Sequence, residues 1–176
     1  MSLIATIAKL GGPAVVKQVA KQFGLNNGTA SKAIGMILPS LAGGLKRNIL
    51  KGDGLSNLVA ELSGGEHFKY VDDPEALASA ETTTDGNGIL GHVLKNKDAS
   101  RAVASTVAGS LGIDEAIVKK MLPQVAAVAM GGLAKQSHAA GLHDGGADSS
   151  EDELRTQLEN MLEVSDASDM LGKLMQ

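Results

Sequence analysis

The sequence predicts an all-α fold, and three observations lead to this prediction. Apolar residues recur at the three- and four-residue spacing of helices, as at Val15, Val19 and Phe23. The 176 residues include two Phe, one Tyr and no Trp, and no stretch alternates β-branched or aromatic residues as strands do. Capping residues and glycines separate the apolar stripes. We therefore expect a multihelical bundle in which small side chains let helices pack closely.

The chain contains an internal similarity. A shift of 88 positions aligns FGLN at 23–26 with LGID at 111–114, and GGL at 43–45 with GGL at 131–133. Such a similarity predicts a fold built from two related helical repeats. The predicted boundaries are 1–136 for a single multihelical domain with repeats 1–52 and 87–136, 137–149 for a flexible linker, and 150–176 for an acidic amphipathic helical arm.

The first repeat predicts two helices joined at a glycine. One helix covers Pro13–Phe23, because proline suits the first position and Gly24 suits the end. Asn26 or Asn27 caps the next helix. Pro39 lies inside its apolar pattern and is expected to kink this helix or divide it in two.

The segment between the repeats is more polar. Leu55–Leu62 has the spacing of a short helix. Asp73 is suited to cap a second short helix over Pro74–Glu81. Thr82–Asn87 is expected to be a polar connection that leads into the second repeat.

The second repeat follows the same plan. Each repeat opens with a short apolar helix, at residues 3–8 and 89–94. Ser100 is expected to cap the following helix, Gly112 to end it, and Asp114 to cap the last one.

The C-terminal part is expected to contain a central helix and the arm. Val125–Met130 is apolar on all sides, which is typical of a buried helix. After the linker, Ser150 and Glu153 fit a capping box, and the helix that follows carries Leu154 and Leu158 on one face. Residues 165–174 are expected to form a last short helix.

Charge is distributed unevenly along the chain, although its net charge is only −4. Residues 1–52 hold seven Lys or Arg and no acidic residue; residues 53–136 hold seven bases and eleven acids; residues 137–176 hold two bases and nine acids. This asymmetry predicts a basic binding face, or an acidic arm that folds back onto it.

Composition excludes several classes of site. The chain has no Cys, which excludes disulfides, thiolate metal sites and Cys nucleophiles. No apolar run reaches the roughly 18 residues that span a bilayer. Residues 1–10 lack the basic leader and cleavage site of a signal peptide. We therefore expect a cytoplasmic protein without a transmembrane segment.

Three segments, GNGILGH, SRAVA and KKMLPQVAAVAMGGLAKQ, resemble the YidB-like family, a bacterial family of unknown function. The resemblance is close over Asp85–Gln136 and looser over the first repeat. It implies a multihelical fold and supplies no catalytic residues. Some relatives end in an Asp/Gly-rich loop like a calcium site. Here that region reads LEVSDASDMLGKLMQ, without the ligand pattern of such a loop, so no calcium site is predicted.

The GNGILGH segment allows two interpretations. Gly86, Gly88 and Gly91 have the spacing of a dinucleotide-binding loop, which requires a preceding strand that the sequence does not offer. We favour a helix start at which glycines permit a tight turn and close packing. His92 is the one candidate for a general base, with Asp85 or Asp98 as a partner, but a structural histidine near a helix interface is favoured.

His138, His143 and Asp144 suggest a metal site, but without an i, i+4 pair or a Cys we favour surface histidines. A helix-turn-helix interpretation is better supported, because small residues flank Gly24 and Gly112 at the spacing of that motif. The basic first repeat could also lie on anionic lipid, although its apolar stripes are better explained as core.

We therefore expect a non-catalytic cytoplasmic interaction or assembly protein that associates with itself or with another protein. The alternatives are a helix-turn-helix-like nucleic-acid binder that uses the basic first repeat, and an enzyme of unknown reaction. No catalytic residue, metal ligand or cofactor is predicted. The residues of the candidate functional surface are Asn87, His92, Lys32, Lys46, Arg47 and Lys51.

Overall fold

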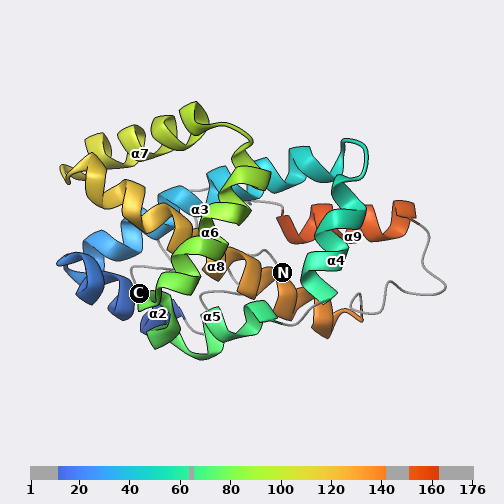
Figure 1. The fold of residues 1–176 in the computed structure, drawn as a ribbon, viewed down its shortest axis with the longest axis horizontal. Coiled ribbons are helices and arrows are strands. Elements are labelled where there is room, and N and C mark those ends of the chain that lie inside the picture. Colours follow the sequence, from blue (N-terminus) through green and yellow to red (C-terminus); the bar gives the residue numbers. More distant parts are fainter. Residues whose placement is uncertain (1–11, 64–65, 142–150, 163–176) are drawn as a thin grey trace.

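The computed structural model describes residues 12–63, 66–141 and 151–162, and these ranges contain helices and no strand (Figure 1). The all-α prediction is confirmed. The elements are α2 (Gly12–Phe23), α3 (Asn27–Ile49), α4 (Gly54–Ser63), the 3-10 helix η1 (Glu66–Phe68), α5 (Lys69–Asp72), the 3-10 helix η2 (Pro74–Ala78), α6 (Ala80–Leu94), α7 (Lys97–Leu111), α8 (Glu115–Ala139) and α9 (Glu151–Leu162). The short helices expected at residues 3–8 and 165–174 lie outside the described residues.

Helix α8 is the centre of the fold, as its all-round apolar sequence predicts. Every residue from Met121 to Ala134 is buried, and α6, α7, α3 and α4 pack around it (Figure 1). Within the described part of the chain, α8 is also the one helix long and apolar enough to cross a membrane, but 78% of that apolar window is buried inside the protein. Burial of this kind is expected of a core helix.

The α2–α3 and α7–α8 junctions have the same geometry. Gly24 and Gly112 adopt left-handed φ values of 66° and 65°, which glycine adopts without steric cost. The next residue donates its N–H back to Ala20 and Ala108 respectively, at 2.9 and 3.2 Å. The predicted stops are therefore confirmed. The similarity of the complete repeats stays a prediction.

The caps that start α3 and α8 are also confirmed. The Asn26 side chain accepts a hydrogen bond from the Thr29 N–H at 2.7 Å. The Asp114 side chain accepts one from the Ala116 N–H at 2.8 Å. Each cap satisfies a donor that the first helical turn leaves without a partner.

The polar connection expected at Thr82–Asn87 is wrong, because these residues lie inside α6. Ser79 caps this helix by accepting from the Thr82 N–H at 3.1 Å. The buried Thr82 hydroxyl donates to the Ala76 carbonyl at 2.6 Å, and η2 therefore ends at Ala78 rather than at Glu81. Tertiary packing outweighs the weak helix propensity of the Thr and Gly residues here.

Two further boundaries differ from the prediction, and one of the two outcomes predicted at Pro39 does not occur. Asn96, not Ser100, caps α7, and its side chain accepts from the Ala99 N–H at 2.6 Å. Helix α3 continues through Pro39, so it is not divided in two. Buried residues on both sides of the proline hold the chain helical. Helix α8 extends to Ala139, so residues 137–139 of the expected linker are helical.

Three glycines allow elements of the bundle to approach closely. A Cβ atom at Gly86 of α6 would overlap the carbonyl oxygen of Pro123 in α8. A Cβ at Gly44 would lie 2.7 Å from the Val93 carbonyl oxygen, and one at Gly131 would lie 2.6 Å from the His67 carbonyl oxygen. These backbones are too close for any side chain, which explains glycine at all three positions.

Helix α9 docks on the core of its own chain. Its apolar face is buried, with Leu158 only 1% exposed, and it packs against α3 and α8 (Figure 1). The amphipathic pattern of the arm therefore predicted its buried face correctly. The capping residue expected at position 150 lies outside the described residues.

Candidate functional site

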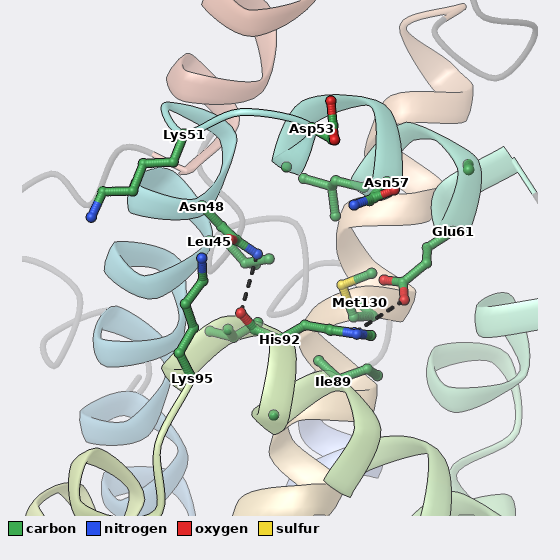
Figure 2. Close-up of a pocket in the computed structure, with 15 residues that line it drawn as sticks. Leu45, Asn48, Lys51, Asp53, Asn57, Glu61, Ile89, His92, Lys95 and Met130 are labelled. Carbon is green, nitrogen blue, oxygen red and sulfur yellow. Dashed lines mark hydrogen bonds and ion pairs between the residues drawn. The ribbon is translucent and has the colours of Figure 1, made fainter.

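Two hollows lie on either side of α6. The first, termed the α4–α6 cleft, has a volume of about 660 Å³ and is formed by the end of α3, by α4 and by α6, with Met130 of α8 also in its lining (Figure 2). Its polar lining residues are Asn48, Lys51, Asp53, Asn57, Glu61, His92 and Lys95. The cleft thus combines cations, carboxylates and amides.

His92 lies at the side of the cleft and points across it toward α4 (Figure 2). Its Nδ1 atom is 3.5 Å from Oε1 of Glu61, and its side chain is 71% exposed. Its carbonyl oxygen accepts a hydrogen bond from the Asn48 side chain at 3.1 Å. The residue lies at a helix interface as predicted, but its ring is exposed to solvent and its partner is neither Asp85 nor Asp98.

An exposed imidazole beside a carboxylate can exchange protons with a bound molecule. Catalysis through a hydroxyl or thiol nucleophile would also need such a group within reach of that base. The described lining of the cleft contains no Ser, Thr or Cys. The imidazole, carboxylates, amides and amines that line it can hold a polar partner through hydrogen bonds and ion pairs.

The second hollow, termed the basic groove, lies on the other side of α6. It consists of two adjoining parts of about 670 and 390 Å³, which share Asn87 and Lys119 in their linings. Five cations line it: Lys95, Lys97, Arg101, Lys119 and Lys120. No carboxylate from the described ranges lines it. The groove therefore has a strongly positive lining in a chain whose net charge is negative.

The predicted surface residues are divided among these places. His92 and Lys51 line the cleft, and Asn87 lines the groove. Lys32, Lys46 and Arg47 lie on α3 and are in none of the described linings. Lys32 and Lys46 are fourteen residues apart, or about 21 Å along the helix. Lys32 is therefore remote from the other three predicted cations, whereas Lys46, Arg47 and Lys51 lie within six residues of one another at the end of α3.

The cations of the groove and Glu61 of the cleft are not among the functional residues predicted from the sequence. The groove cations belong to residues 53–136, a segment of net negative charge, and an average over that segment hides them. One local signal was present. Lys97 and Arg101 are four residues apart and therefore share a helix face.

The GNGILGH segment separates the two hollows. It lies in the C-terminal half of α6, and Gly91 lines both the cleft and the groove. The interpretation of this segment as a helix start is wrong, because the helix begins at Ala80. No strand precedes α6 in the described ranges, so the context of a dinucleotide-binding loop is missing.

The other histidines are placed as follows. His138, near the end of α8, packs edge-on against the ring of Phe68, with the ring centroids 5.5 Å apart. His143 and Asp144 lie outside the described residues. Among the residues that are described, no three His, Asp or Glu side chains are grouped as metal ligands would be.

Comparison with known proteins identifies a family. No curated protein and no solved structure matches the chain. The family described as "Bacterial protein of unknown function (DUF937)" matches residues 6–136, which include both hollows. The chain belongs to this DUF937 family of bacterial proteins.

Proposed function

We propose that the protein is a non-catalytic assembly protein of the bacterial cytoplasm that associates with a second copy of itself through the outer face of α6. This face is defined by Thr84, Asn87, Gly88, Gly91 and Lys95, which recur every three or four residues and are all exposed. The observation that supports the proposal is the environment of Gly88 and Gly91. A Cβ atom at either position would meet nothing within 4 Å.

A glycine inside a helix costs about 1 kcal/mol relative to alanine. At Gly86, Gly44 and Gly131 a close backbone contact within the chain explains that cost. Nothing in the described protein explains it at Gly88 and Gly91, both of which lie inside α6 with normal helical geometry. If the helix backbone of a second subunit packed closely against Gly88 and Gly91, that contact would explain glycine at these two positions in the same way.

An antiparallel α6–α6 contact on a two-fold axis suits this face. Gly88 would meet Gly91 of the partner subunit, and Thr84 would meet Lys95 of the partner subunit. The two copies of Lys95 would lie about 16 Å apart along the axis, twice the Debye length of about 8 Å at physiological salt. A parallel contact would place them side by side, so charge favours the antiparallel arrangement.

The arm is not needed for this contact. Helix α9 packs on α3 of its own chain, and none of its residues lines the cleft or the groove in the described ranges.

We also propose that the chain is a YidB-like member of its family. The segments GNGILGH, SRAVA and KKMLPQVAAVAMGGLAKQ support this narrower assignment.

The double substitution Gly88→Ala with Gly91→Ala tests the proposal. It should raise the free energy of unfolding by about 0.5–1 kcal/mol per site, because alanine is the better helix former and both sites are open. It should also weaken self-association by about tenfold or more, which corresponds to at least 1.4 kcal/mol. Sedimentation velocity over a concentration series measures the association, and urea denaturation measures the stability.

Gly109→Ala is the matched control, because Gly109 is exposed on α7 and a Cβ there also meets nothing within 4 Å. This variant should associate like the wild type. A wild-type protein that stays monomeric at every concentration would contradict the proposal. Unchanged association of the double variant would contradict the α6 face as the interface.

A further inference from the structure

The basic groove is positively charged, although the segment that supplies its cations, residues 53–136, has a net negative charge. Residues 53–136 hold eleven acids and seven bases, yet five of those seven bases line the groove. Two of the five have an acidic neighbour: Arg101 lies 3.4 Å from Asp98, and Lys119 lies 2.6 Å from Glu115. The other three have no ion-pair partner among the described residues.

A buried acceptor without a donor lies at one end of the groove. Gln124 of α8 is only 2% exposed and lines the smaller part. Its Oε1 atom has no hydrogen-bond partner within the described ranges. Buried polar atoms are nearly always hydrogen-bonded, because an unpaired one loses its bonds to water without replacement. Among the described residues, Gln124 Oε1 is therefore left as a buried acceptor that a donor from elsewhere could satisfy.

The opposite end of the groove is the start of α7. Asn96, Lys97, Ser100 and Arg101 line it there. The first turn of this 15-residue helix contains Asp98, and Asn96 already caps its Ala99 N–H. The partial positive charge of the helix start still favours an anion there. Lys95 precedes this turn and has a φ of 59°, the one positive φ at a non-glycine residue in the described ranges.

We propose that the basic groove binds a phosphorylated small molecule that also carries a hydroxyl or N–H donor. The phosphate lies at the start of α7 against Lys97 and Arg101, and the donor reaches Oε1 of Gln124. The two parts of the groove have volumes typical of small-molecule sites, about 300–1,000 Å³. None of the observations behind this binding depends on the α6–α6 contact, although Asn87, Gly91 and Lys95 belong to both surfaces.

A small molecule fits the groove better than single-stranded nucleic acid does. Proteins that bind single strands stack the bases on aromatic side chains. Phe23 is the one aromatic residue among the described lining residues, and it is partly buried against the core. The positive charge is also gathered at the junction of α6, α7 and α8.

Titration of the full chain with three probes tests the proposal: ribose 5-phosphate, inorganic pyrophosphate and oligothymidylate. Amide chemical shifts in ¹H–¹⁵N spectra locate the binding, and calorimetry at low ionic strength gives Kd. Ribose 5-phosphate and pyrophosphate should shift the amides of residues 96–101. The double variant Lys97→Gln with Arg101→Gln should raise both Kd values about tenfold or more, because it removes two charged phosphate contacts.

Lys17→Gln with Lys21→Gln is the matched control, because these exposed lysines lie on α2 and the net charge changes equally. It should change Kd less than about twofold. Gln124→Leu should weaken binding of ribose 5-phosphate but not of pyrophosphate, and should raise the Tm because a buried acceptor without a partner is removed.

Three results would overturn the assignment. The first is the absence of shifts at residues 96–101 with both phosphates. The second is an equal loss of affinity in the α2 control, which would indicate unspecific attraction. The third is tighter binding of oligothymidylate than of ribose 5-phosphate with dependence on the same two cations, which would make the groove a nucleic-acid site.

Discussion

Gly86→Ala is expected to lower the free energy of unfolding by about 3 kcal/mol, at the upper end of the range for overpacked cores. The new Cβ would overlap the carbonyl oxygen of Pro123, and the Cα and carbonyl carbon of the same residue are also too close. These are backbone atoms of the central helix, so they cannot move aside as the end of a flexible side chain can. Helices α6 and α8 would have to separate, although alanine itself favours the helix.

Urea denaturation followed by circular dichroism measures this effect. Gly109→Ala is an internal control, because it makes the same chemical change inside helix α7, where the added Cβ meets nothing within 4 Å. It should raise stability by about 0.5–1 kcal/mol. If the two variants changed stability in the same direction, the close approach of α6 to Pro123 would be wrong.

Leu158→Ala is expected to cost about 2–4 kcal/mol, as for other large-to-small changes in a core. Leu158 is 1% exposed and lies on the buried face of α9 with Leu154, Met161 and Leu162. The substitution removes apolar contacts with α3 and leaves a cavity beneath the arm. Because α9 has only twelve residues, it depends on docking for its helicity.

Chemical denaturation of this variant, followed by far-UV circular dichroism, tests the docking of the arm. Gln157→Ala is the matched control at the neighbouring exposed position and should change stability by less than about 0.5 kcal/mol. Equal stabilities of the two variants would show that α9 does not pack on the core in solution. A separate early loss of helicity in Leu158→Ala would show that the arm unfolds before the bundle.

The elements that sequence analysis predicted well are those defined by their own residues. The end of α2 at Gly24 and the cap of α8 at Asp114 depend on contacts within five residues along the chain. The buried face of α9 follows from the spacing of its leucines. Such features need no knowledge of the rest of the fold, because the physical cause lies in the local backbone and in helical periodicity.

The predictions that failed concern residues whose conformation depends on distant partners. Thr82–Asn87 is helical because Thr82 is buried against Ala76 and Gly86 against Pro123. Of the two outcomes predicted at Pro39, a kink or a division, only the division is wrong, because packing on both sides outweighs the missing hydrogen bond. Local propensities are worth at most about 1 kcal/mol per ordinary residue, which tertiary burial can exceed.

The same distinction, between features with a local cause and features that depend on distant partners, applies to the candidate sites. His92 and Asn87 were identified because they lie in an unusual local segment. Lys97 and Lys120 were not, because their significance arises only when α7 and α8 come together beside α6.

The sequence by itself determined the all-α class, the helix ends at glycine and the apolar faces, since these follow from local backbone conformation and periodicity. Only the tertiary structure decided which glycines are crowded and which are open, and which cations share a groove. Both depend on the distance between residues far apart in the chain, and that distance is set by how the helices pack around α8.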